Sequence, residues 1–152
     1  MTHEWIWLDM DGTIADLYGV DGWLDDLMAY RARPYEEATP LYDSIDLLET
    51  LSDLKDAGYK IGIISWLSKK PTAEYNERVI KAKKEWLKKQ YLDLLLDEII
   101  ITAYGIKKSD TCRGYGKGIL VDDEEQNRNA WDLGKTIDAT ENILTALRGL
   151  LK

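Results

Sequence analysis

The sequence predicts an α/β protein with a Rossmann-like three-layer sandwich, in which helices cover both faces of a mostly parallel sheet. Short apolar runs alternate along the chain with longer segments in which apolar residues recur every three or four positions. This alternation is typical of β-α-β units, whose crossovers place successive strands in parallel. Polar residues directly follow several of the apolar runs, so the predicted strands have polar ends.

Length and composition limit what the protein can be. A chain of 152 residues has the size of one domain, and we expect a single domain over residues 1–152. Its formal net charge of −8 disfavours duplex nucleic acid or an anionic membrane as the main partner. No apolar run approaches the roughly 20 residues that span a bilayer, and the single Cys112 cannot form an internal disulfide. We therefore expect a soluble, cytoplasmic protein.

The first strand is expected at residues 5–8 and ends in the sequence Asp-Met-Asp-Gly-Thr, residues 9–13. This motif delivers two carboxylates, Asp9 and Asp11, to the carboxyl end of a strand, where open α/β sheets bind ligands. Aspartate and glycine are also ordinary turn residues. Taken alone, the motif favours a solvated turn.

Residues 14–40 are expected to form a small helical insert outside the sheet. Apolar residues around Trp23 and Leu27 have the spacing of two to three helical turns, and Pro34 and Pro40 interrupt the pattern. A helix should follow, with Asp43 as its N-cap and Gly58 as its stop.

The middle of the chain predicts two more strands around a long helix. The second strand covers residues 59–65 and ends in the hydroxyl of Ser65. The helix begins near Thr72, directly after Pro71, and continues to around Leu95. A third strand over residues 98–102 contains three consecutive isoleucines, which suggests cover on both faces.

The last third of the chain predicts one more buried strand and a terminal helix. Asp138 and Glu141 have the spacing of a capping box for that helix. The elements expected before it are a polar loop over residues 103–117, a strand over 118–123, a short helix over 127–131 and an edge strand over 135–137.

In a parallel sheet all these strand ends lie at one edge, so separate turns become one cluster. Carboxylates at two strand ends are hard oxygen ligands suited to Mg²⁺, and a further carboxylate can attack phosphorus and become phosphorylated. A hydroxyl and a lysine can hold the phosphate oxygens, while a second carboxylate protonates the leaving alcohol and activates water. The cluster therefore predicts a phosphatase. Its members are Asp9, Asp11, Ser65, a lysine of the 103–117 loop, Asp122 and Asp123.

Four parts of the chain resemble the motifs of the haloacid dehalogenase-like (HAD) phosphatases, in matching order and strand context. They are the Asp-Met-Asp-Gly-Thr sequence at 9–13, Ser65, Lys108 and the Val-Asp-Asp sequence at 121–123. The resemblance extends over residues 5 to about 131. It implies a HAD-type core, with the insert at about 14–40 acting as a cap.

The resemblance also implies roles for individual residues. Asp9 would be the nucleophile and Asp11 the acid and base, while Ser65 and Lys108 would hold the phosphate. Mg²⁺ would bind Asp9, the carbonyl oxygen of Asp11, and Asp122.

Two positions stay open at this point. Asp123 could bind the metal through water or only orient its neighbours. Lys107 adjoins Lys108, and the latter is preferred because its position after Tyr104 and Gly105 better fits the phage-type pattern.

A closer similarity is to the 5′(3′)-deoxyribonucleotidases and related phage-type nucleotidases. Ala15-Asp16, Lys83-x-x-Trp86 and the sequence at 119–123 carry it, which implies a nucleoside monophosphate as the substrate. The chain departs from that family at Ser65-Trp66-Leu67, where the family has Thr-Ser-Pro, and in a longer loop before the fourth strand. Trp66 is consequently a candidate for a wall of the phosphate pocket.

Lys83 falls within the apolar arc of its helix, together with Val79 and Trp86. One interpretation is a side chain that lays its stem on apolar surface and keeps its charge in water. The other is a lysine that reaches the substrate phosphate, as the resemblance implies.

The leading hypothesis is thus a Mg²⁺-dependent phosphomonoesterase that forms an aspartyl-phosphate and acts on a small phosphorylated metabolite, a nucleoside (deoxy)monophosphate. A polynucleotide end phosphatase is a second possibility, disfavoured by the net acidity. A third possibility is a non-catalytic phosphate- or partner-binding domain, or a receiver-like module whose aspartate is phosphorylated for signalling. Asp11 disfavours it, because a pure phosphoryl acceptor needs no acid and base beside it. The sequence does not indicate an oligomeric state.

Overall fold

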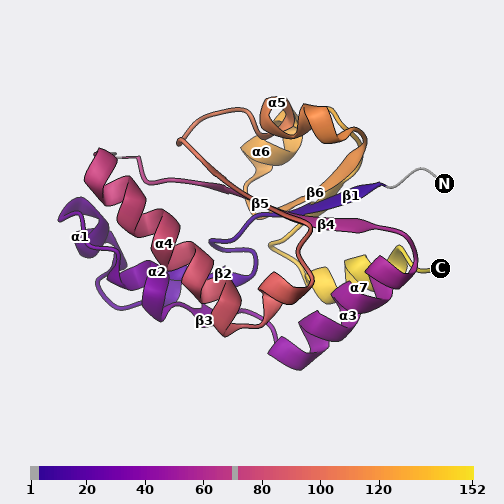
Figure 1. Ribbon diagram of the computed structural model, residues 1–152, viewed down its shortest axis with the longest axis horizontal. Coiled ribbons are helices and arrows are strands. Elements are labelled where there is room, and N and C mark those ends of the chain that lie inside the picture. The colour runs from indigo at the N-terminus through magenta and orange to yellow at the C-terminus, as the bar shows by residue number, and fades with distance from the viewer. Residues whose placement is uncertain (1–3, 70–71) are drawn as a thin grey trace.

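The computed structural model describes residues 4–69 and 72–152, so that Pro71 lies outside the described residues. A five-stranded parallel sheet with the order β5-β4-β1-β6-β7 forms the middle layer (Figure 1). The predicted α/β class is confirmed. The sheet strands are β1 (Trp5–Leu8), β4 (Lys60–Trp66), β5 (Glu98–Thr102), β6 (Gly118–Asp122) and β7 (Thr136–Asp138).

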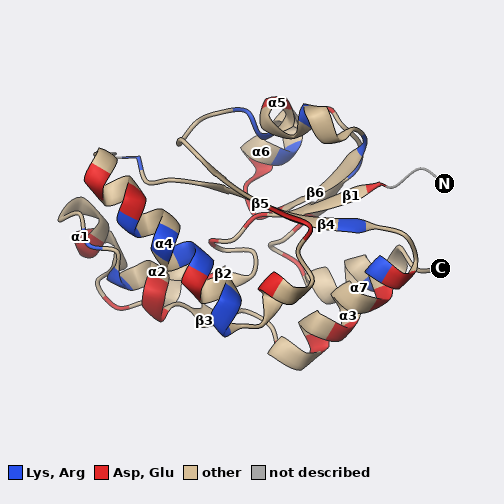
Figure 2. Ribbon diagram, viewed as in Figure 1, with Lys and Arg blue, Asp and Glu red and all other residues tan. Residues whose placement is uncertain are grey.

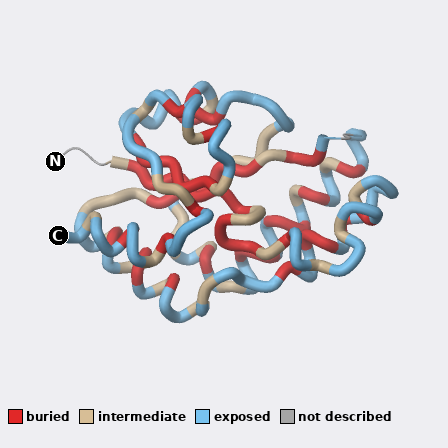
Figure 3. Tube along the Cα trace, turned by 180° about the vertical axis from the view of Figure 1, so that it is seen from behind, coloured by how far each residue is buried: buried red, intermediate tan, exposed pale blue. Residues whose placement is uncertain are grey.

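Strand β1 is the centre of the sheet, with β4 and β6 on its two sides. Its side chains alternate between the two faces because successive residues of a strand point in opposite directions. Ile6 and Leu8 enter the core on one face, while Trp5 and Trp7 enter the core on the other. All four are buried, and Figure 3 shows a concentration of buried residues in the middle of the sheet.

Helices cover both faces of the sheet (Figure 1). The larger core lies under α3 (Ser44–Asp56), α7 (Ile143–Gly149) and the C-terminal half of α4 (Ala73–Lys89). The smaller core lies on the other face, where α5 (Lys108–Cys112) and α6 (Glu125–Ala130) are found. The predicted N-cap of α3 is confirmed, since the Asp43 carboxylate accepts hydrogen bonds from two backbone N–H groups of the first turn.

The segment over residues 14–40 forms short elements outside the sheet. It packs on the N-terminal half of α4 through a cluster that includes Leu17, Tyr35, Tyr75 and Val79. Its elements are β2 (Ala15–Asp16), a 3₁₀ turn (Leu17–Gly19), α1 (Trp23–Met28), α2 (Arg33–Glu37) and β3 (Thr39–Pro40), with β2 and β3 paired antiparallel.

Three expected boundaries were wrong. Helix α4 ends at Lys89, because Tyr91 adopts a left-handed conformation (φ 61°) and a 3₁₀ turn (Leu92–Leu94) follows. The expected loop over 103–117 contains α5 and a 3₁₀ turn (Arg113–Tyr115). The expected capping box does not form: Asn142 caps α7, and the Asp138 carboxylate accepts bonds from Thr140 instead.

Strand β5 is an edge strand, and each of its residues is half-buried. Its three isoleucines do pack on both sides, since Ile99 and Ile100 lie against different cores. Acidic and basic residues both lie along α4 (Figure 2), and they include the ion pairs Glu74–Arg78 and Lys81–Glu85. Among the described residues, the helices are all too short or too polar to cross a bilayer.

Candidate phosphoryl-transfer site

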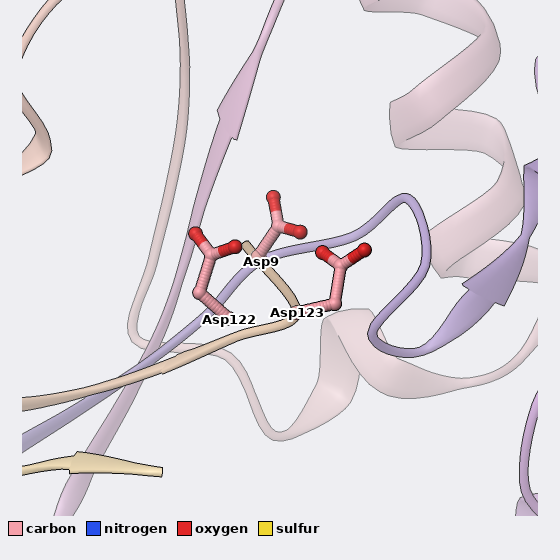
Figure 4. Close-up of side chains that lie close together, drawn as sticks. All are labelled: Asp9, Asp122 and Asp123. Atoms are coloured by element: carbon pink, nitrogen blue, oxygen red, sulfur yellow. The ribbon is translucent and has the colours of Figure 1, made fainter. Parts of the chain in front are cut away.

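Three carboxylates converge at the carboxyl edge of the sheet. Asp9 directly follows β1, Asp122 ends β6, and Asp123 is the next residue. One oxygen from each lies within 4.8 Å of the others, and Figure 4 shows the three side chains extending to the same side. Because β1 and β6 are parallel neighbours in register from Trp5↔Gly118 to Leu8↔Val121, their ends meet at this point.

The turn after β1 is shaped to fit against Asp123. Gly12 has a φ of 80°, and a Cβ atom there would collide with the Asp123 carboxylate, so a side chain is excluded on two counts. The hydroxyl of Thr13 reaches Asp9 Oδ2 at 3.1 Å and Asp123 Oδ1 at 3.4 Å. Thr13 therefore orients the carboxylate of Asp9.

Lys108 brings a positive charge to this cluster. Its ammonium group is buried and donates to Asp9 Oδ1 at 3.0 Å and to Asp122 Oδ2 at 2.7 Å. Burial opposes its charge, but Asp9 and Asp122 raise the pKa of Lys108 above its ordinary value. Lys107 turns outward and pairs with Asp132 at 3.3 Å. Of the two neighbouring lysines, the structure thus places Lys108 in the site.

Asp122 is held by two further donors. Its Oδ1 accepts from the Glu124 backbone N–H at 2.9 Å, and its Oδ2 accepts from Asn127 Nδ2 at 3.1 Å. Asn127 comes from the first turns of α6, directly after β6. The carboxylate of Asp122 is therefore fixed in position before any ligand binds.

Lys83 forms a second buried charge pair beside the first. Only 1% of its surface is exposed, so the interpretation in which its charge stays in water is wrong. Its Nζ donates to Ser65 Oγ at 2.7 Å, to the Trp66 carbonyl oxygen at 2.8 Å and to Asp11 Oδ2 at 3.0 Å. These acceptors match the three N–H bonds of an ammonium group. Lys83 thereby joins α4, the end of β4 and the turn after β1.

Burial and mutual repulsion raise the pKa values of the carboxylates in this site. Burial, followed by the charge of Asp9, raises the pKa of Asp123 to about 8. Burial and Asp9 also raise the pKa of Asp122, although Lys108 opposes the shift. Burial raises the pKa of Asp11 against the opposing charge of Lys83. A cluster of this kind gains stability when a cation binds to it.

A cavity of about 470 Å³ opens from the carboxylates toward the insert. Asp9, Lys108 and Asp122 line its inner end, and α1 of the insert lines its outer part. Trp66 also lines the cavity. Its indole Nε1 donates to the Ile106 carbonyl oxygen at 2.8 Å, and the Lys108 ammonium lies 5.4 Å from the ring centre.

The sequence-predicted residues fall into two groups in space. Asp9, Lys108 and Asp122 make one hydrogen-bonded group, and Asp11, Ser65 and Lys83 make the other, with the Trp66 carbonyl. Sequence reasoning left Asp123 open and did not single out Thr13 or Asn127. Thr13 belongs to the Asp-x-Asp-Gly-Thr motif and Asp123 to the Asp-Asp pair, so the signal for both was present; Asn127 had none.

Comparison with known proteins reveals the fold but not a family. No protein-family model matches the chain, and no curated protein matches its sequence. The crystal structure of D,D-heptose 1,7-bisphosphate phosphatase from Burkholderia thailandensis is similar, with a TM-score of 0.59 and 12% sequence identity. The alignment covers 98% of this chain and 99% of that chain. Over the aligned part, the chain thus has the α/β fold that this phosphatase structure also has.

Proposed function

We propose that the chain is a metal-dependent phosphomonoesterase that works through a phosphorylated aspartate. The observation that carries this proposal is the convergence of Asp9, Asp122 and Asp123 within 4.8 Å, with a buried lysine bound to two of them. The fold shared with a sugar bisphosphate phosphatase supports it, as do the HAD-like motifs that the chain carries.

The donor set fits Mg²⁺. Asp9 and Asp122 would hold the cation, with the Asp11 carbonyl oxygen as the third protein ligand and the Asp123 carboxylate beside them. All are hard oxygen donors, which Mg²⁺ prefers. Burial and then the charge of Asp9 raise the pKa of Asp123, and a bound cation would offset both effects. When bound, the cation would stabilise negative charge on the phosphoryl oxygens.

Asp9 is the proposed nucleophile. Thr13 and Lys108 donate to different oxygens of its carboxylate, which fixes the direction of the attacking group. A bond forms between an Asp9 oxygen and phosphorus while the bond from phosphorus to the ester oxygen breaks. Water then attacks the phosphorylated Asp9, which releases inorganic phosphate and regenerates the carboxylate.

Asp11 is the proposed acid and base. It would give a proton to the leaving alcohol in the first step and take one from water in the second. Its carboxylate lies outside the three-carboxylate cluster and is held by Lys83 at 3.0 Å. Because the Asp11 carboxylate is not part of the cluster proposed to hold the metal, it can serve in proton transfer instead.

Ser65 and Lys108 are the proposed phosphate-binding side chains, with Trp66 as a neighbouring wall. Lys83 fixes Ser65 at 2.7 Å and would reach the phosphate itself by exchanging one of its three hydrogen bonds. The positive charges of Lys83 and Lys108 would together offset the phosphate charge in this buried site.

The proposed substrate is a nucleoside (deoxy)monophosphate, and the proposed setting is cytoplasmic. Support for this substrate comes from a cavity of about 470 Å³ that is lined largely by rings and aliphatic side chains, which suits a nucleoside. The similar structure is named for a heptose bisphosphate. A sugar phosphate is therefore the main competitor, ahead of a polynucleotide end or a non-catalytic role.

Hydrolysis of a panel of phosphate esters tests the proposal. We expect release of inorganic phosphate from 4-nitrophenyl phosphate and from deoxynucleoside monophosphates in the presence of Mg²⁺, and loss of activity when EDTA removes the metal. The panel should include heptose and ribose phosphates and a 5′-phosphorylated oligonucleotide. A folded protein that neither hydrolyses any of these esters nor binds Mg²⁺ would show a non-catalytic domain.

A further inference from the structure

Two pairs of aromatic rings line the cavity. Tyr18 and Trp23, from the insert, meet edge to face with ring centroids 5.0 Å apart. Trp66, at the end of β4, and Tyr104, in the loop after β5, have centroids 4.9 Å apart. The hydrogen bond from Trp66 to the Ile106 carbonyl keeps that indole in place. Fixed rings offer flat apolar surface with little loss of conformational freedom on binding.

Aliphatic side chains at the mouth of the cavity are left in contact with water. Leu24 and Met28 lie one turn apart on α1, and each keeps 52% of its surface exposed while lining the cavity. An exposed group of large apolar side chains beside a cavity indicates a surface that a ligand covers. The part of the ligand that reaches α1 should therefore be apolar.

The charges around the cavity suit one phosphate group and not two. Among its described lining residues the cations are Lys69 and Lys108, and Lys108 is committed to the inner carboxylates. Lys69 lies in the loop after β4, with its ammonium 5.2 Å from the Tyr104 ring centre. Among the described lining residues, a second phosphate farther out would find the exposed ammonium of Lys69 and the Glu124 carboxylate. This arrangement disfavours a bisphosphate.

The cavity offers few fixed groups for reading a base edge. Asn127 is the only amide side chain among the described lining residues, and its Nδ2 donates to Asp122 at 3.1 Å. Amide side chains are well suited to paired hydrogen bonds with a base edge. With this amide committed, contact with ring faces is the mode that the aromatic lining favours, and such contact is tolerant of base identity.

We propose that the outer cavity selects esters with one phosphate by holding a flat ring system between the Trp66–Tyr104 pair and α1, and that it accepts purine and pyrimidine nucleotides alike. Sugar phosphates, which carry no flat aromatic ring system, and esters with a second phosphate are disfavoured. This inference rests on the proposed function and names how that site chooses its substrate.

Steady-state kinetics with Mg²⁺ on four matched substrates test the inference. They are dAMP, dTMP, ribose 5-phosphate and deoxyadenosine 3′,5′-bisphosphate. We expect kcat/KM for the two mononucleotides to agree within about fivefold, and the other two to be roughly ten- to a hundredfold lower, mainly through KM, as loss of a stacked base implies.

A variant of the cavity mouth separates ring recognition from phosphate recognition. We expect Met28→Ser to raise the KM for dAMP about three- to tenfold by removing apolar contact, while the KM for ribose 5-phosphate and inhibition by orthovanadate stay unchanged. Ile45→Ser is the matched control, because Ile45 is 66% exposed on α3 and does not line the cavity.

The outcomes distinguish the inference from the function on which it rests. The inference is wrong if ribose 5-phosphate or the bisphosphate is hydrolysed as efficiently as the mononucleotides, or if one base is preferred by about a hundredfold or more. In either case the proposed phosphatase function still stands. If no ester is hydrolysed, 4-nitrophenyl phosphate included, the proposed function is wrong and the inference falls with it.

Discussion

The two ends of the cavity differ in polarity and in exposure to solvent. The inner end consists of buried charges at the ends of β1 and β6, fixed by hydrogen bonds to Asp9 and Asp122. The outer end consists of exposed apolar side chains on α1, a helix of six residues in the insert. In our account the rigid sheet edge carries the chemistry and the insert carries substrate choice, so changes at the two ends should affect different kinetic constants.

The strongest test of this division is at the inner end. We expect Asp9→Asn to reduce kcat by about 10⁴-fold or more, as the loss of a nucleophile does in other enzymes. The fold should be retained, because asparagine has the same shape and removes one of three mutually repelling charges. Asp132→Asn is the control, an exposed carboxylate outside the cavity. A kcat within about tenfold of wild type would remove Asp9 from the nucleophile role.

A substitution of Asp11 tests whether different carboxylates of the inner end carry out metal binding and proton transfer. We expect Asp11→Asn to reduce kcat by about 10²- to 10⁴-fold with a poor leaving group, yet to keep Mg²⁺ affinity measured by calorimetry. Asp122→Ala should lose that affinity, since its carboxylate belongs to the cluster and that of Asp11 does not. Equal loss of Mg²⁺ binding in both variants would show that the Asp11 side chain is a ligand.

Lys83 tests the connection between the two buried groups. Methionine would retain the packing of its stem but leave Ser65 and Asp11 without their shared donor. We expect Lys83→Met to fold, with the free energy of unfolding lowered by about 1–3 kcal/mol, and to bind orthovanadate roughly tenfold more weakly. Lys84→Met, one residue on and exposed, should change neither quantity. Unchanged vanadate affinity in Lys83→Met would restrict this lysine to a structural role.

The smallest expected effect is on stability against pH. Because the folded pKa of Asp123 is raised to about 8, the folded state keeps a proton that the unfolded state releases above its ordinary pKa near 4. Without metal, the melting temperature should therefore fall as the pH rises from about 4 to about 8. Mg²⁺ should raise it more at pH 8 than at pH 5, because the cation competes with that proton.

Asp123→Asn provides the check on that pH effect. Asparagine carries no ionisable proton, so the slope of melting temperature against pH should become shallower in the metal-free variant. An unchanged slope would assign the pH dependence to other groups, since Asp11 and Asp122 also have raised pKa values.

Much of the inner end could be predicted from the sequence, because it depends on local patterns. Short apolar runs followed by aspartate gave β1 and β6, and parallel pairing then required Asp9 and Asp122 to meet. The N-cap of α3 was likewise local, since Asp43 bonds to residues two and three positions on. Such features need only neighbouring residues to decide them.

Distant contacts decided some of what the sequence missed or left open, and competing local contacts decided the rest. Helix α5 was missed because it has no apolar periodicity. Lys108 was preferred from the sequence, but its contact with Asp9, 99 positions away, could be seen only in the structure. The sequence did not decide whether the Lys83 ammonium group lies in water or in the site. The structure decides it, because Ser65 and Asp11 accept hydrogen bonds from this group. Asp138 and Glu141 had capping-box spacing, but the Asp138 carboxylate bonds to Thr140 and Asn142 caps α7.

Direct observation of the phosphorylated protein tests the central claim most directly. Asp11→Asn should still accept a phosphoryl group from 4-nitrophenyl phosphate, whose leaving group needs little protonation, and should release it slowly. After brief reaction with Mg²⁺ and acid quench, mass spectrometry should find the mass of one phosphoryl group on the peptide that contains Asp9. An unmodified protein, or a phosphoryl group on another residue, while the wild type turns over, would contradict the account.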